Sequence, residues 1–306
     1  MKMRQFLSST VFLAIISCVL WSTAFVGIKI GLTYTTPIQF AGIRFFLSGL
    51  MLVPLCGSIT RFFSEGKQHI GTILKVSFLQ TFILYTFFYL GISLIPGALT
   101  AIIIGSQPLF AAIVAHLFMD NDKMSVRKFL TISFGISGIV LIAIKKGFQG
   151  SGSYYEIGGM LLLILANIAS GLGNIVVSKR KGTISPLILN AWQMSLGGLS
   201  LFLVSLFIEP FNGFNFPAAY YGALSWLSFL SAAAFSIWFM LLQKPGVKVS
   251  DLNIWKFIIP VFGALLSWII LPDESPDFYS LSGMTIIGIS VILYTKQNRR
   301  ASKSAR

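Results

Sequence analysis

Ten stretches of mostly apolar residues follow one another along the chain, separated by short polar breaks. A helix needs about 20 such residues to cross the hydrocarbon core of a bilayer. The stretches nearly fill the 306-residue chain and leave little of it for a separate soluble domain. We therefore predict an all-α integral membrane protein with ten transmembrane helices, over residues 7–28, 37–57, 72–92, 97–119, 127–144, 157–178, 186–208, 218–242, 250–271 and 278–295.

Composition points away from a water-soluble protein. Hydrophobic residues make up 55% of the chain and charged residues only 10%, whereas about a quarter of the residues of a soluble domain are charged. The net charge of +14 comes from short clusters of Lys and Arg that form no basic face, which argues against a nucleic-acid partner. Cys18 and Cys56 both fall in apolar stretches and give neither a disulfide framework nor a metal-ligand spacing. We expect no metal and no cofactor.

The N-terminus has some features of a signal peptide, because Lys2 and Arg4 precede an apolar run. That run continues past Cys18 to about Ile28, which is too long for the apolar region of a signal peptide and long enough to span a bilayer. We therefore expect it to remain as the first transmembrane helix.

Lysine and arginine are distributed unequally between alternate connections, as the positive-inside rule requires. One set of alternate connections, counted with the two termini, is rich in Lys and Arg. The other set carries only Lys145 and Lys146, with Lys29 at the margin of the first stretch. The asymmetry predicts two cytoplasmic termini and a basic cytoplasmic tail over 297–306. We expect a multi-pass protein of the bacterial cytoplasmic (inner) membrane. The residues assigned to the cytoplasm are Lys2, Arg4, Arg61, Lys67, Lys123, Arg127, Lys128, Lys179, Arg180, Lys181, Lys244, Lys248, Lys296, Arg299, Arg300, Lys303 and Arg306.

The chain contains an internal repeat. Residues 107–112 (QPLFAA) and 259–264 (IPVFGA) are offset by 152 positions, and the same offset places Asp122 on Glu274. Repeats over 1–147 and 154–296 would each contain five spans. Because five is odd, the second repeat must cross the membrane in the opposite orientation, so we predict two inverted five-helix repeats around a central cavity.

The repeat places one proline in the middle of a span in each half, Pro108 and Pro260. Each proline lacks the amide that would bond to the carbonyl four residues back, so the carbonyls of Ile104 and Lys256 are expected to be free. Polar backbone at this depth is tolerated only against protein or a wet cavity. One proline alone could be a simple kink, but two at equivalent positions favour a central cavity.

Several polar side chains lie inside the predicted spans. Asn167, Ser170 and Asn174 form one stripe of the sixth span, where they either bond to neighbouring helices or line the cavity. On the ninth span, Asn253 and Lys256 share a face with Pro260. The Lys256 ammonium could hold an anionic substrate group or extend to the headgroups. Arg44, in the second span, is interpreted as structural.

The sequence resembles the EamA family of the drug/metabolite transporter superfamily along almost its whole length. The resemblance is carried by residues 21–25 (WSTAF), 28–32 (IKIGL) and 44–46 (RFF) and by the two proline-centred segments. It implies a permease, frequently an exporter of amino acids or related metabolites, with a cavity lined by the first, third, fourth, sixth, eighth and ninth helices. One departure is Ile259, where many members have Glu before the proline.

We therefore predict export of a small polar metabolite, such as an amino acid or related compound, by alternating access. A facilitator or exchanger of an anionic metabolite held by Lys256 is the first alternative. An intramembrane enzyme is a remote one, because no acid lies in mid-span and only two histidines are present. The expected partners are a small-molecule substrate and the lipid bilayer, in a monomer or homodimer. The predicted binding residues are Gln107, Asn167, Asn174, Asn253, Lys256, Trp21 and Tyr89.

Overall fold

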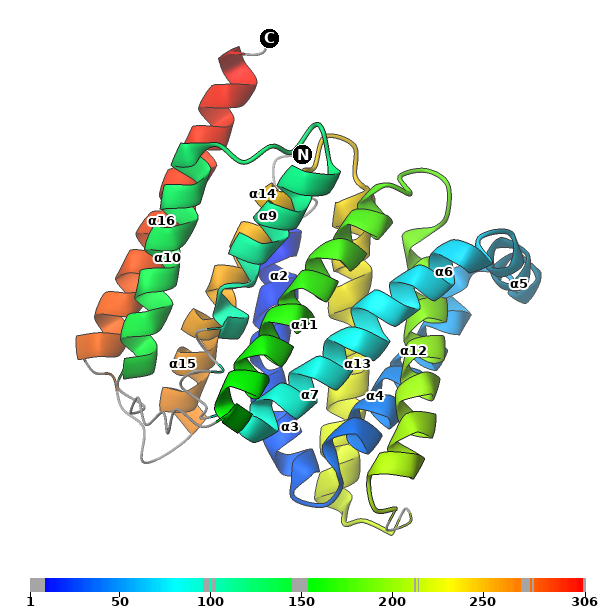
Figure 1. The fold of residues 1–306 in the computed structure, drawn as a ribbon. Helices are drawn as coiled ribbons and strands as arrows, with labels where there is room; N and C mark the ends of the chain where they lie inside the picture. The colour runs from blue at the N-terminus through cyan, green and yellow to red at the C-terminus, as the bar shows by residue number, and fades with distance from the viewer. Residues whose placement is uncertain are drawn as a thin grey trace. The chain divides into compact units, whose positions relative to one another are not determined.

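The computed structural model describes residues 9–95, 100, 103–144, 154–211, 213, 215–270, 276 and 278–304. Every regular element in these ranges is a helix, which confirms the predicted all-α class (Figure 1). Six helical stretches in this part of the chain are long and apolar enough to cross a membrane, as predicted for the first, second, third, sixth, seventh and eighth spans. They are Thr10–Leu32, Pro37–Cys56, Ile70–Leu94, Tyr154–Ser178, Pro186–Ile208 and Ala218–Gln243.

The other four predicted spans also fall on helices, although these are shorter, interrupted or only partly apolar. They correspond to α9 (Gln107–Phe118), to α10 (Val126–Ile144), to the series α14 (Val249–Asn253), η3 (Ile254–Phe257) and α15 (Ile258–Ile270), and to α16 (Phe278–Ser304). The helix α16 runs past the predicted end of the tenth span at residue 295. Residues 297–304 of the predicted tail therefore continue a helix, in keeping with their Gln, Arg, Ala and Lys, which are good helix formers.

The helices form two compact units, and each unit takes helices from both halves of the sequence. Unit 1 contains residues 1–89 and 173–246, and unit 2 contains residues 90–172 and 247–306. The units therefore do not follow the boundaries of the predicted repeats, because helices from the two halves pack together within each of them.

In unit 1, α4 (Pro37–Leu52) packs along α12 (Pro186–Ile208), and α13 (Ala218–Gln243) packs on α4 and on the pair α2 (Thr10–Ser22) and α3 (Ala24–Leu32). Glycine makes the close approach of α4 and α12 possible, because a Cβ atom on Gly198 would lie 2.3 Å from the backbone nitrogen of Phe46. The contacts of Gly42 with Phe202 and of Gly49 with Ser195 show that the two helices run antiparallel. Small residues are the usual means of close helix packing in membranes.

The third span, also in unit 1 for most of its length, changes its winding along the way. It consists of α6 (Ile70–Val76), the π-helix η2 (Ser77–Ile83) and α7 (Leu84–Leu94). Before it, the short η1 (Val53–Cys56) and the amphipathic helix α5 (Ile59–Gln68) connect it to α4. A π-helix of this length is unusual, since such turns mostly occur singly and at functional sites.

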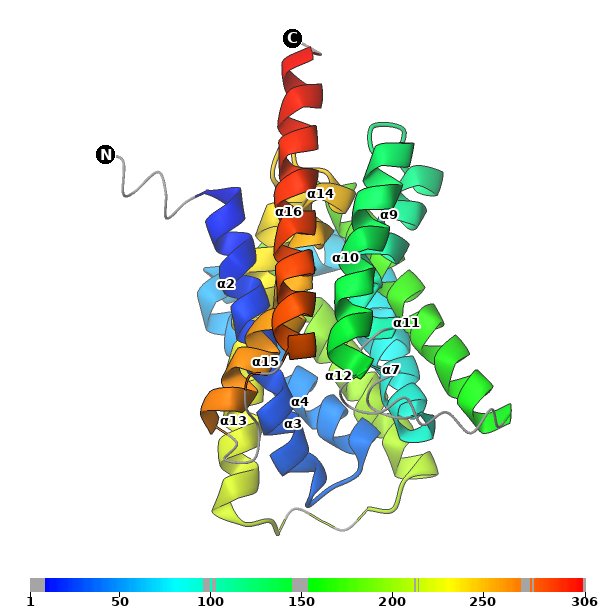
Figure 2. The same cartoon turned by 90° about the vertical axis from the view of Figure 1, so that its left-hand side faces the viewer.

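In unit 2, α10 and α16 lie side by side in both views of the ribbon (Figure 2). The Ser290 hydroxyl donates to the Thr131 carbonyl oxygen at 2.7 Å, and a Cβ atom on Gly138 would lie 2.6 Å from the carbonyl oxygen of Gly283. These two contacts show that α10 and α16 also run antiparallel. The helix α9 packs on α14 and η3 in the same unit.

Three carboxylates cap the beginnings of helices that are distant in sequence. Glu209, just after α12, accepts from the backbone amides of Ile38 at 2.9 Å and Gln39 at 2.8 Å at the start of α4. Glu65, in α5, accepts from the amide of Ser185 before α12 at 3.2 Å. In unit 2, Asp122 accepts from the amide of Ser250 at 2.8 Å. A carboxylate at a helix N-terminus satisfies orphan amides and complements the helix dipole.

Candidate functional site

The fourth span is interrupted directly before Pro108. A helical turn over 103–105 ends at a turn at Ser106, and α9 then begins at Gln107 with the proline in its first turn. A proline is tolerated there because its missing amide would have had no helical partner. The carbonyl that the Asn167 side-chain amide reaches, at 2.6 Å, is that of Ile103, one residue before the predicted Ile104, and it also accepts from the Ser106 amide at 3.2 Å.

The polar stripe of α11 (Tyr154–Ser178) lies against this interruption. The Gln107 side-chain amide donates to the Ser170 hydroxyl at 2.8 Å. A Cβ atom on Gly171 would lie 3.4 Å from Ala111 of α9, so the two helices are in contact there. Asn167 is 1% exposed and Ser170 is 2% exposed, whereas Gln107 is only partly buried. Asn167 and Ser170 therefore bond to a neighbouring helix, which is the first of the two roles predicted for the stripe. Their partner Gln107 in α9 remains partly accessible.

The ninth span is interrupted in a comparable place. The α-helix α14 passes into the 3₁₀-helix η3, and Pro260 lies in the first turn of α15. Asn253 is fully buried and donates to the Val249 carbonyl oxygen within its own helix at 2.9 Å. Lys256 lies in η3 and is partly exposed. Because α9 packs on α14 and η3, the two interrupted helices lie next to each other in unit 2.

Unit 1 contains a buried amide network, which we define as Gln80, Thr81, Asn174, Asn190, Gln193 and Ser236. The Gln80 amide donates to Asn174 at 2.7 Å. The Thr81 hydroxyl donates to the Gln193 side chain at 2.6 Å, and Gln193 in turn donates to Asn190 at 2.9 Å. Asn190 donates to the Ser236 hydroxyl at 2.9 Å. The network connects η2, α11, α12 and α13 through neutral side chains.

A buried arginine lies among aromatic rings in the same unit. Arg44 is 2% exposed, donates from Nε to the Ser231 hydroxyl at 2.9 Å, and has its guanidinium 4.8 Å from the centre of the Phe45 ring. The Tyr85 ring lies 4.2 Å from Phe45 and 6.4 Å from Tyr89. On the α2 side, Trp21 makes edge contacts at 5.1 Å with both Phe235 and Trp238. The cation–π contact and the serine bond explain how this cation is held in a membrane-spanning helix.

Unit 2 contains a second polar group, the ion cluster of Asp122, Lys128, Ser250, Asp251 and Tyr294. The Lys128 ammonium lies 3.4 Å from Asp122 and 3.3 Å from Asp251. The Ser250 hydroxyl donates to Asp122 in a short hydrogen bond, and the Tyr294 hydroxyl donates to Asp251 at 3.2 Å. The Asp122 side chain is completely buried. The cluster ties the loop before α10 to α14 and α16.

Comparison with known proteins identifies the family. The sequence profile of the EamA-like transporter family matches residues 8–144 and again residues 157–296. The chain belongs to the EamA-like transporter family. A solved structure titled only as the crystal structure of a protein has the same fold, with a TM-score of 0.82 and 15% identity over 96% of this chain and 99% of that one.

Two similar relatives of this EamA-like chain are named as uncharacterized transporters from Bacillus subtilis. YoaV is 23% identical and the match covers 95% of this chain and 99% of the relative. YvbV is 25% identical and the match covers 94% of this chain and 91% of the relative. These names and the family support transport across a membrane and do not specify a substrate.

The predicted binding residues of this EamA-like chain fall in both units. Gln107, Asn167, Asn253 and Lys256 belong to unit 2, and Asn174, Trp21 and Tyr89 belong to unit 1. The structure brings Gln107 and Asn167 to the same interruption of the fourth span. It does not bring Asn174 there, because this side chain bonds to Gln80 instead.

The sequence analysis missed both the amide network and the ion cluster. A signal for the network was present, since Asn190 and Gln193 are one helical turn apart in an otherwise apolar span and Gln80 has Thr81 beside it in another. For the ion cluster, the sequence shows only that no acid lies in mid-span. The available signal was that Ser250 and Asp251 lie at the start of a helix. A carboxylate from elsewhere in the chain can cap an amide at such a position.

Proposed function

We propose that this EamA-like protein exports a small polar metabolite by alternating access. The observation that carries the proposal is the pair of interrupted helices, α9 and α14–η3–α15, which pack together in unit 2. Transporters commonly bind substrate at such discontinuous helices, because their exposed backbone and end dipoles recognise polar groups. Gln107 and Lys256 are partly exposed polar residues at the two interruptions.

Two observations support an origin in two inverted five-helix repeats. The family profile matches the chain twice, over 8–144 and 157–296. The second spans of the two repeats, α4 and α12, pack antiparallel, and so do the fifth spans, α10 and α16. An inverted duplication places equivalent helices in opposite directions, so this packing is the arrangement that it predicts.

The second candidate function is exchange or facilitated movement of an anionic metabolite. Lys256 favours it, because this cation lies one turn before Pro260 within the interrupted span. In this version the ammonium binds a carboxylate or phosphate of the substrate, and Gln107 contributes a neutral hydrogen bond.

Transport can be tested with purified protein in proteoliposomes, after a thermal-shift screen of amino acids, nucleosides and organic acids has selected a substrate. A carrier should show saturable flux and counterflow, and linear flux without counterflow would contradict alternating access. Comparing right-side-out with inside-out vesicles gives the direction. Tags on both termini should be accessible from the cytoplasm, and termini on opposite faces of the membrane would contradict the inverted topology.

Lys256→Met separates the two candidates. If Lys256 binds the substrate, the variant loses uptake of anionic compounds and retains flux of neutral ones, with unchanged expression and melting temperature. Lys248→Met is the matched control, because Lys248 precedes α14 and is exposed. Unchanged anion flux in Lys256→Met would remove this residue from the binding site.

A further inference from the structure

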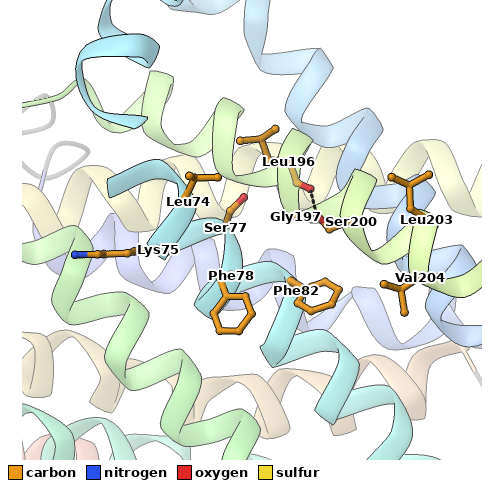
Figure 3. Close-up of a pocket in the computed structure, with 10 residues that line it drawn as sticks. All are labelled: Leu74, Lys75, Ser77, Phe78, Phe82, Leu196, Gly197, Ser200, Leu203 and Val204. Atoms are coloured by element: carbon orange, nitrogen blue, oxygen red, sulfur yellow. Dashed lines mark hydrogen bonds between the residues drawn. The ribbon is translucent and has the colours of Figure 1, made fainter. Parts of the chain in front are cut away.

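A groove of about 670 Å³ lies on the surface of unit 1, along the third span and α12 (Figure 3). Both elements are among the membrane-spanning stretches, so this surface is exposed to lipid hydrocarbon wherever no protein covers it. The groove is lined by Leu74, Lys75, Ser77, Phe78, Phe82, Leu196, Gly197, Ser200, Leu203 and Val204.

Three small residues line the groove, Ser77, Gly197 and Ser200, and both serine hydroxyls are already bonded. A Cβ atom on Gly197 would lie 2.5 Å from the Thr81 Cβ, so only glycine allows this approach of α12 to η2. The Ser77 hydroxyl donates to the Gln193 carbonyl oxygen at 2.7 Å, and the Ser200 hydroxyl donates to the Leu196 carbonyl oxygen at 2.8 Å. Neither serine hydroxyl is therefore left without an acceptor when an apolar ligand occupies the groove.

The π-helix forms one wall of the groove. Phe78 and Phe82 follow each other on η2 and stack, with ring centres 5.9 Å apart. Leu196, Leu203 and Val204 of α12 stand opposite (Figure 3). Phe78 is 52% exposed and Leu203 is 49% exposed, so the walls remain open to the surface between them. A narrow apolar trough with branched and aromatic walls fits an alkyl chain.

Lys75 lies at one end of the groove and Val204 at the other (Figure 3). Lys75 is exposed, and none of the ion pairs found in the described ranges involves it. The eight-residue advance from Leu196 to Val204 of α12, which lines the groove, corresponds to about 12 Å of α-helix, which is close to the ~15 Å depth of one leaflet of a ~30 Å hydrocarbon core. The long stem of Lys75 allows its ammonium to reach the headgroup level.

We propose that the groove binds one acyl chain of an anionic phospholipid, whose phosphate pairs with Lys75. The positive-inside pattern assigns the Lys75 end to the cytoplasmic leaflet, where anionic headgroups attract lysine. The chain lies along Phe78 and Phe82, and its end reaches Leu203 and Val204. The proposal requires only that the protein lies in a bilayer, so its failure would leave the transport proposal standing.

The test compares how much of each lipid the full-length wild type and its variants retain. Each protein is placed in nanodiscs of mixed phosphatidylglycerol and phosphatidylcholine, and the lipids that stay bound are measured by native mass spectrometry. The wild type should retain phosphatidylglycerol preferentially, and Lys75→Gln should lower that preference about fivefold. Lys67→Gln is the matched control, because Lys67 is an exposed lysine of α5 that does not line the groove. A preference that is unchanged in Lys75→Gln, or equally reduced in Lys67→Gln, would overturn the headgroup assignment.

A second variant tests the acyl chain independently of charge. Ser200→Phe places a ring in the groove from an exposed position, so it should fold normally and reduce retention of both lipids. If Ser200→Phe retains as much of each lipid as the wild type does, the proposal that an acyl chain occupies the groove is overturned. The melting temperature of each variant without added lipid confirms that folding is unchanged.

Discussion

The two units solve the problem of buried polar groups in different ways. Unit 1 keeps its amide network neutral and places it within membrane-spanning helices, where Gln193 connects Thr81 to Asn190. Unit 2 has a charged cluster, but locates it where α14 and α10 begin, around Asp122 and Lys128. In these two groups, neutral side chains join helices at depth and charges join them at helix ends. Arg44 differs from both, because it is a charge held within a span, where it joins α4 to α13 through Ser231.

The difference follows from the cost of removing each group from water. A charge within hydrocarbon is far more expensive than an amide, and a buried ion pair stabilises only when its remaining hydrogen-bonding positions are also satisfied. Asp122 meets that condition, because its two oxygens accept from the Ser250 amide, the Ser250 hydroxyl and Lys128. Neutral hydrogen bonds between helices contribute less each, so the amide network uses several of them.

The largest expected effect is that of Asp122→Asn. The variant leaves Lys128 with one carboxylate fewer and places an amide nitrogen against the Ser250 donors, so we expect a loss of about 3 kcal/mol in the free energy of unfolding. The loss should appear as a lower melting temperature in detergent. Asp120→Asn is the control, since Asp120 lies in the same loop and makes an exposed ion pair with Lys123 at 3.5 Å. Equal effects of the two substitutions would show that burial of the cluster is not what stabilises it.

An intermediate effect is expected for Gln193→Leu. It removes two side-chain hydrogen bonds and leaves Thr81 and Asn190 to find other partners, which should cost about 1–2 kcal/mol. Denaturant titration of detergent-solubilised protein would measure this. Ser200→Ala on the same helix should be nearly neutral, because that hydroxyl bonds only within its own helix. A loss for Gln193→Leu that exceeds that for Asp122→Asn would reverse the ranking of the two regions.

The smallest effect concerns Glu65 and depends on pH. Partial burial alone would raise the pKa of its carboxyl, but the hydrogen bonds from Arg61 and Ser185, with the charges of Arg61 and His69, outweigh burial and hold the pKa below its usual value. A lowered folded-state pKa means that the stabilisation is complete above the unfolded-state value near 4.5 and is lost as the pH falls through the folded value.

Since Glu65 is partly exposed, its contribution should be at most about 1 kcal/mol. We expect the melting temperature of the wild type to fall more between pH 6 and pH 3 than that of Glu65→Gln. Parallel pH profiles for the two proteins would contradict the role of this carboxylate.

The sequence predicted uninterrupted spans well, because their signal is local. The window 186–208 coincides with α12, whose start has Ser185 as N-cap followed by Pro186. The interrupted spans were harder to predict. Pro108 reveals that a helix is disturbed, but the position of the break depends on Asn167 reaching Ile103 from another helix.

Hydrogen-bond partners were not predictable for the same reason. The spacing of Asn167 and Asn174 places them on one face of α11, but Asn174 bonds to a residue 94 positions away, Gln80. The polar character of a position can be read locally, whereas its partner is decided by how distant helices pack. The depth of Arg44 was visible in the sequence, and its serine and phenylalanine partners confirm a packed environment.

The carboxylate caps of unit 1 have a mechanical consequence. Each of α4 and α12 is followed along the chain by a carboxylate that caps the start of the other: Glu209 comes directly after α12, and Glu65 lies in α5, the helix after α4 and η1. Sliding one helix along the other would break both contacts at once, at opposite ends of the pair. The two helices, together with α5, should therefore resist sliding and move as one rigid group.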